Sequence, residues 1–175
     1  SGNFEMFKSI LGINTGDLWR WNKDTGLRIL PGTDAAQPNG IEVSADGEFV
    51  YANMYMENEV WKVNAQTGET VAVASLTHGA DNSAWGTDGR LWVVTHTDGF
   101  ANILSCFQRQ AHPCGASFEV VAIDPVSMGT EVVFAHSGAP MGAATVAVPQ
   151  GERVYLGSFV GDRLISVPNF SPAPN

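Results

Sequence analysis

Short stretches in which apolar and polar residues alternate recur along the whole chain, and turn sequences separate them. Residues 17–22 alternate in this way, and a Lys-Asp-Thr-Gly turn joins them to a second run at residues 27–30. Another hairpin pattern surrounds Asp46-Gly47, with strand-like residues at 40–43 and 49–51. Alternation predicts half-buried strands. Asp-Gly between two such runs predicts a tight hairpin, because glycine adopts positive φ without steric cost. The pattern therefore predicts an all-β protein.

Both hairpin patterns are repeated. The first returns near residues 60–73 and 120–134, and the second returns near residues 82–92 and 143–155. Asn22 and Asn64 end corresponding strands 42 residues apart, and the turn residues Asp46 and Asp88 are also 42 residues apart. A repeat of about 40 residues with four strands in each unit is typical of β-propeller blades. Since a blade is too thin to bury its own faces, we expect neighbouring blades to stack.

The repeats predict a single domain, residues 1–175, that forms about three blades of a β-propeller. Its expected parts are an outer hairpin (17–30), two blades (40–74 and 82–135), a partial blade (143–167) and an insertion loop (98–117). Propellers close with about four to eight blades, and an open blade edge exposes unpaired backbone groups. We therefore expect a companion chain or a second copy to complete the ring, unless the sequence is part of a longer chain.

Composition narrows the range of partners. Hydrophobic residues make up 44% of the chain and charged residues 15%, which favours a packed globular core. The net charge is −9, and basic residues do not cluster, so the sequence predicts no nucleic-acid partner. No apolar run approaches the length that crosses a bilayer, so we expect no membrane span.

Cys106 and Cys114 are the two cysteines of the chain, and they lie within the predicted insertion. With one nearby histidine they cannot form a closed zinc site without outside ligands. A disulfide that closes a surface loop and a pair of free thiols are the two remaining interpretations. A disulfide would indicate an oxidising compartment, secreted or periplasmic; otherwise the sequence leaves the location open.

Polar side chains come directly before two of the predicted innermost strands. Asn39 precedes one of these strands, and Asp81 and Asn82 precede the next. Because innermost propeller strands start around a central channel, these side chains could converge there. Carboxylate and amide oxygens are ligands that hard cations prefer, calcium above all. The alternative interpretation is that these side chains only stabilise the local backbone, since Asn and Asp are common in turns and at strand entries, where they form local hydrogen bonds.

Two stretches resemble known families. Pro38-Asn39-Gly40-Ile41 followed by Ser44-Ala45-Asp46-Gly47 is similar to the gluconolactonase and senescence-marker-protein family. Asp81-Asn82 followed by Asp88-Gly89-Arg90-Leu91-Trp92 looks still more like the paraoxonase/arylesterase branch. The resemblance covers about residues 15–167 and corresponds to the C-terminal half of a six-bladed propeller.

The resemblance implies a reaction type, the metal-dependent hydrolysis of lactones or esters. In these families a calcium or other divalent ion lies in the channel and polarises a lactone or ester carbonyl. By this resemblance Asn39, Asp81 and Asn82 match metal ligands, and His96 matches a histidine near the pocket. The expected function is a metal-dependent hydrolase of lactones or esters, in which Asp81 or His96 activates a water. The family's glutamate ligand from the first half of the propeller has no counterpart here.

Two other functions fit the same scaffold. A strictosidine-synthase-like propeller would use it without a metal, although the presence of Asn39, Asp81 and Asn82 argues against that. A non-catalytic propeller that only binds a ligand is the third possibility, because a fold does not define a function.

Overall fold

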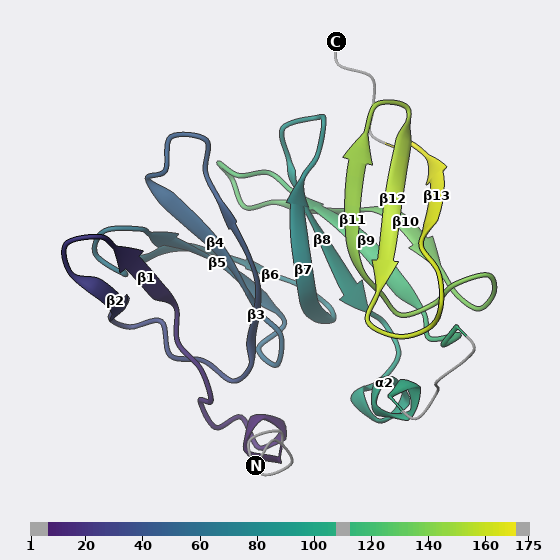
Figure 1. Cartoon of the computed structure of the whole chain (residues 1–175), viewed down its shortest axis with the longest axis horizontal. Coiled ribbons are helices and arrows are strands. Elements are labelled where there is room, and N and C mark those ends of the chain that lie inside the picture. Colours follow the sequence, from purple (N-terminus) through teal and green to yellow (C-terminus); the bar gives the residue numbers. More distant parts are fainter. Residues whose placement is uncertain (1–6, 108–112, 171–175) are drawn as a thin grey trace. The chain divides into compact units, whose positions relative to one another are not determined.

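A computed structural model describes residues 7–107 and 113–170 of the chain. The chain divides into two compact units, residues 1–80 and residues 81–175. Strands joined by tight turns dominate both units (Figure 1). The all-β prediction is confirmed, and the four-stranded antiparallel sheets have the form of propeller blades. Within the described residues no helix is long and apolar enough to cross a membrane.

The first unit contains a two-stranded hairpin and one complete blade. The hairpin strands are β1 (Trp19–Asn22) and β2 (Gly26–Ile29). The blade has the order β3 (Pro38–Val43), β4 (Phe49–Met54), β5 (Glu59–Asn64) and β6 (Thr70–Ser75), with every pair antiparallel. The hairpin and the blade share a core of Leu18, Leu30, Ala35, Ala52, Met54 and Val63, with Trp61 packed against it.

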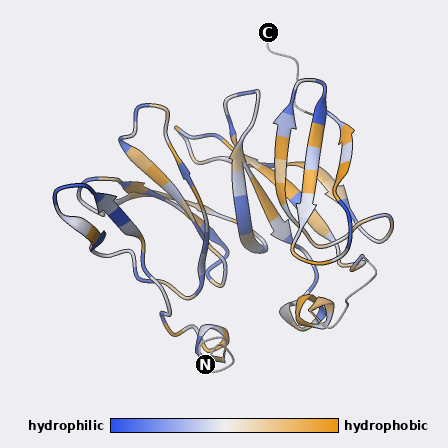
Figure 2. Ribbon diagram, viewed as in Figure 1, coloured by the Kyte–Doolittle hydropathy of each residue, from blue (hydrophilic) through white to orange (hydrophobic). Residues whose placement is uncertain are grey.

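The second unit contains a four-stranded and a three-stranded sheet. The first has β7 (Gly79–Trp85), β8 (Leu91–His96), β9 (Phe118–Ile123) and β10 (Thr130–His136) in sequence order. The second has β11 (Ala144–Gln150), β12 (Arg153–Ser158) and β13 (Ile165–Pro168). Figure 2 shows alternating bands of hydropathy along β12, where Val154 and Leu156 are buried and their neighbours Arg153 and Tyr155 are exposed.

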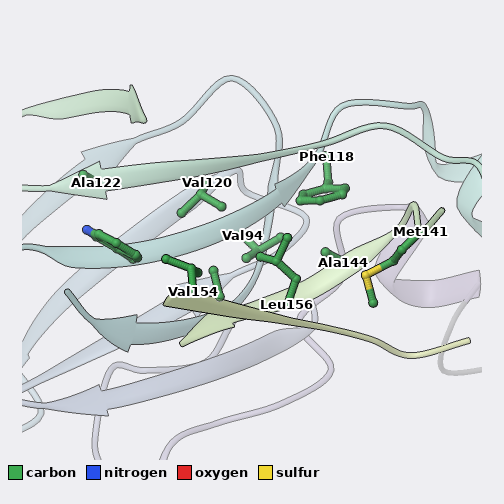
Figure 3. Close-up of a cluster of buried hydrophobic side chains, with 10 residues drawn as sticks. Val94, Phe118, Val120, Ala122, Met141, Ala144, Val154 and Leu156 are labelled. Atoms are coloured by element: carbon green, nitrogen blue, oxygen red, sulfur yellow. The ribbon is translucent and has the colours of Figure 1, made fainter. Parts of the chain in front are cut away.

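Side chains from both sheets of the second unit form its main core. Figure 3 shows Val94 and Val120 of the first sheet among Val154 and Leu156 of the second, with Met141 at one end of the cluster. All five are at most 1% exposed. Strands β8 and β11 contact each other directly, so this core joins His96 at the end of β8 to the start of β11.

The insertion at residues 98–117 contains a helix that its hydropathy pattern had not predicted, α2 (Phe100–Cys106). The helix lies below the strands of the second unit in Figure 1. Its last residue forms a disulfide with Cys114, which confirms the bonded interpretation of the two cysteines. Ile103, Cys106, Cys114, Ala116 and Ala143 form a second buried cluster around this bond. The disulfide is therefore part of a packed core.

The innermost strands begin a little earlier in the sequence than their polar entry residues. Strand β3 starts at Pro38 and β7 starts at Gly79, so Asn39 and Asp81 lie inside the strands instead of before them. The pairing of β3 with β4 shifts between Pro38 and Ile41, so that Asn39 and Gly40 lie opposite a single residue, Asn53. This is a β-bulge, a feature that redirects side chains at strand ends and near functional sites.

Candidate functional site

Three of the four predicted site residues lie together in the second unit. Asp81 and Asn82 are in β7, and His96 is the last residue of the adjacent strand β8. The Oδ2 atom of Asp81 is 3.8 Å from Nε2 of His96. The side chains are 12% and 2% exposed, respectively. The two side chains are therefore neighbours in a part of the unit that is largely shielded from water.

The imidazole of His96 has a defined hydrogen-bonding partner. Its Nε2 atom is 2.9 Å from the carbonyl oxygen of Ala144. A carbonyl only accepts hydrogen bonds, so Nε2 donates and carries the proton. Burial lowers the pKa of His96 below its ordinary value, while the Ala144 bond and the charge of Asp98 act in the opposite direction. The net lowering of the pKa favours the neutral ring, and in that form the lone pair lies on Nδ1.

Asn82 supports the carboxylate of Asp81 from the next position of β7. Its Nδ2 atom donates to Oδ1 of Asp81 at 2.8 Å. The amide group is thereby oriented, because its nitrogen faces Asp81 and its carbonyl oxygen is directed elsewhere. The pair combines one carboxylate and one amide oxygen, the hard donors that suit Ca²⁺. Across the described ranges, no three His, Cys, Asp or Glu side chains gather into a metal-binding group.

Asn39, the fourth predicted residue, lies in the first unit. It is an exposed residue in the β-bulge at the start of β3.

Sequence reasoning missed the groups that surround His96 from outside its own blade. The Phe159 ring stands edge-on to the His96 ring with the centroids 6.0 Å apart, and Phe107 packs on Phe159 at 4.7 Å. Asp98, whose charge favours protonation of His96, accepts a hydrogen bond from the backbone N–H of Ser117 at 2.9 Å. These residues come from the insertion and the partial blade. No periodic signal marks them, because only tertiary folding brings them to the site.

The fold and the site define a class: part of a β-propeller with an oxygen-rich and histidine-containing site at the start of an innermost strand. A family model described as Arylesterase matches residues 4–165. The chain belongs to the arylesterase family, in agreement with the resemblance in its sequence.

Two solved structures illustrate the similarity in fold. Regucalcin from Agrobacterium tumefaciens, a calcium-binding protein, is 18% identical with a TM-score of 0.50, and the match covers 82% of this chain and 44% of that one. Sqt1 from Saccharomyces cerevisiae is 15% identical with a TM-score of 0.54, and the match covers 93% and 43%. The chain therefore spans less than half the length of these two proteins. Among curated proteins, no sequence is similar enough to match.

Proposed function

We propose that this protein is a hydrolase of lactones or esters, and that its site uses calcium or another divalent cation. The observation that carries the proposal is the arrangement of Asp81, Asn82 and His96. A buried carboxylate, oriented by a neighbouring amide, lies 3.8 Å from the imidazole of His96, in a chain of the arylesterase family.

The residues fit a hard cation. Oxygens of Asp81 and Asn82 would hold it together with Asn39, and further ligands would come from water or from the rest of the propeller. When bound, the cation would supply Lewis-acid polarisation of the substrate carbonyl. A single carboxylate among mostly neutral ligands leaves the site positive, which favours the oxyanion that develops as the carbonyl is attacked.

We infer different roles for the two titratable residues of this site, Asp81 and His96. His96 donates from Nε2 to Ala144, so this nitrogen is not the base. General-base action by His96 would use Nδ1. Asp81 would orient the attacking water and help to fix the cation. The Phe159 ring beside His96 excludes water from that side of the imidazole and favours an apolar substrate portion there.

We also propose that further blades complete the propeller, supplied by a companion chain, a second copy or the rest of a longer chain. The hairpin β1–β2 and the sheet β11–β12–β13 have fewer strands than the four-stranded blades. The disulfide between Cys106 and Cys114 is consistent with a secreted or periplasmic location.

An assay of aryl-ester and lactone hydrolysis tests the proposal. Activity should disappear after exhaustive chelation and return with calcium. Asp81→Asn should lower kcat/KM by about a hundredfold or more and weaken calcium binding. Asn39→Ala should act in the same direction less severely, since it removes a neutral ligand.

The matched control is Asp162→Asn, because Asp162 is exposed in the same unit and pairs with Arg163. This variant should keep wild-type activity. Hydrolysis that survives chelation, or normal turnover in Asp81→Asn, would refute the metal-dependent reaction. Calcium binding without hydrolysis of either substrate class would favour a non-catalytic propeller. A chain that neither binds calcium nor hydrolyses them would favour the strictosidine-synthase-like alternative.

A further inference from the structure

The carbonyl group that accepts the proton of His96 comes from a distant part of the chain. Ala144 is the first residue of β11 and lies 48 positions after His96, and the two are joined by the 2.9 Å contact from Nε2 to the Ala144 oxygen. Both residues are buried, so water does not compete for this bond. The direction in which the Ala144 carbonyl points therefore determines which nitrogen of the neutral ring carries the proton.

The turn before Ala144 is held in an unusual conformation. Ala143 has a φ of 50°, in the left-handed region that disfavours residues with a Cβ. Two hydrogen bonds hold it there: its N–H donates to the carbonyl of Ala116 at 2.7 Å, and its carbonyl accepts from Oγ of Ser158 at 2.8 Å. Such strained residues persist where the surrounding structure fixes them and are common at functional sites.

Gly142 brings this turn against the segment Cys114–Ala116. A Cβ at position 142 would overlap the carbonyl oxygens of Cys114 and Ala116, so only glycine allows the two backbones to approach so closely. The disulfide ties Cys114 to the end of α2, and Cys106, Cys114, Ala116 and Ala143 belong to one buried cluster. A continuous packed path thus leads from the disulfide to the Ala144 carbonyl.

We propose that Gly142 and the disulfide-anchored segment Cys114–Ala116 position the catalytic histidine. By holding the Ala144 carbonyl on Nε2, they keep His96 in the tautomer whose lone pair is on Nδ1. They do not touch the substrate and act only through Ala144. This inference rests on the proposed function for its effect on turnover. The tautomer itself is independent of any reaction.

The test uses the purified full chain labelled with ¹⁵N at histidine. Long-range ¹H–¹⁵N correlation spectra distinguish protonated from unprotonated ring nitrogens. In the wild type, Nε2 of His96 should have the protonated signature and Nδ1 the unprotonated one. Gly142→Ala should shift both signals toward a mixture of tautomers. It should also lower kcat about tenfold, as loss of a supporting interaction does, with KM unchanged.

Gly99→Ala is the matched control. Gly99 comes directly before α2, has a φ of −58°, and a Cβ there would meet nothing within 4 Å. This variant should keep both the wild-type tautomer and the wild-type kcat. A wild-type His96 protonated at Nδ1 would overturn the proposal. So would a Gly142→Ala protein that loses kcat while its ring nitrogens keep the wild-type signature, because the residue would then be merely structural.

A second variant keeps the test decisive if Gly142→Ala does not fold. Ser158→Ala removes the hydroxyl that bonds to the Ala143 carbonyl and adds no atoms. It should shift the tautomer in the same direction by a smaller amount, and an unchanged signature would contradict the positioning role. If the wild type hydrolyses neither substrate class but the variants change the tautomer as expected, the proposed function fails while the positioning of the ring stands.

Discussion

Asp88 shows how a single side chain stabilises a turn between two strands. It lies between β7 and β8, where its carboxylate accepts hydrogen bonds from the backbone N–H of Arg90 at 3.1 Å and from Arg90 Nε at 2.8 Å. Arg90 also binds Glu131 at 2.6 Å. Although partial burial opposes ionisation, these bonds lower the pKa of Asp88 below its ordinary value of 3.8. The ionised form is thus the one that the folded turn prefers.

The first prediction concerns Asp88→Asn. The variant should have a free energy of unfolding about 1 kcal/mol lower at pH 7, because it loses a charge-assisted bond. A group whose pKa is lower in the folded state stabilises the fold above its unfolded pKa, and this contribution is lost as the pH falls. The difference between the two proteins should therefore shrink below pH 3.8. Urea unfolding at pH 7 and pH 3 measures it, with Asp162→Asn as the control. An equal difference at both values would contradict the assignment.

Gly68 and Gly47 illustrate two different reasons why a position requires glycine, its backbone angle and the space around it. Both have positive φ, 81° and 74°. A Cβ at position 47 would meet nothing within 4 Å, whereas a Cβ at position 68 would overlap the backbone of Pro31. Position 47 therefore requires glycine only for its backbone angle, and position 68 requires it also for space.

The second prediction compares the alanine variants of these two glycines. Gly47→Ala should lower the free energy of unfolding by about 1 kcal/mol, the cost of a left-handed residue with a Cβ. Gly68→Ala should cost at least about 1 kcal/mol more, because overlap adds to the same conformational cost. Chemical unfolding of both variants provides the measurement. Equal losses would mean that the contact with Pro31 relaxes without cost.

At the scale of elements, the helix α2 depends on the disulfide that ends it. The helix has seven residues, no side-chain cap at its start and no basic residue in its last turn. Isolated helices this short are unstable in water. Its stability therefore comes from the buried cluster that includes Ile103 and the two half-cystines.

The third prediction is the effect of removing this bond. The double variant Cys106→Ala/Cys114→Ala should lose about 2 to 3 kcal/mol of unfolding free energy, the entropy of closing a loop whose ends are eight positions apart. A reductant should destabilise the wild type by a similar amount and leave the double variant unaffected. Alkylation before reduction should modify no thiol in the native protein. Two reactive thiols in the unreduced protein would refute the bond.

At the scale of the whole molecule, equivalent positions of the repeats differ in how much of the side chain is exposed to solvent. Trp21, Val63 and Ile123 occupy corresponding positions of the repeated hairpin pattern, each directly before a polar residue, Asn22, Asn64 or Asp124. Val63 and Ile123 are 0% exposed, whereas Trp21 in the hairpin β1–β2 is 68% exposed. The neighbouring Trp19 is 56% exposed. The β1–β2 hairpin therefore presents a face that the complete blades bury.

The fourth prediction is that the protein in solution covers this face with further strands. Its particle mass, measured by light scattering, should exceed that of a single 175-residue chain, or should include a companion chain. Trp21→Lys should weaken the association, because burying an unpaired charge is costly. Lys substitution of the exposed Val126 is the control and should have no effect. A stable, monodisperse particle with the mass of one 175-residue chain would contradict the prediction.

Local patterns in the sequence were sufficient for the strands and for the choice of candidate site residues. Alternation and Asp-Gly turns predicted the hairpins, because strand pairing across a tight turn depends on neighbouring residues. The 42-residue repeat predicted the blades. Residue type marked Asp81 and Asn82 as candidates, the family resemblance added His96, and adjacent strands of one blade bring the three together. Cys106 and Cys114 were close enough in sequence to suggest their bond.

Contacts between distant parts of the chain decided the rest. The bulge at Asn39 depends on how β3 pairs with β4, and α2 depends on a cluster that includes Ala143 of the partial blade. The tautomer of His96 depends on the carbonyl of Ala144, 48 residues away. The nearby Gly142 is required because a Cβ there would overlap the backbone of Cys114 and Ala116, a contact that only the folded structure shows. Hydropathy reports which face of an element is buried. It carries no information on which backbone group will be found there, because that depends on packing.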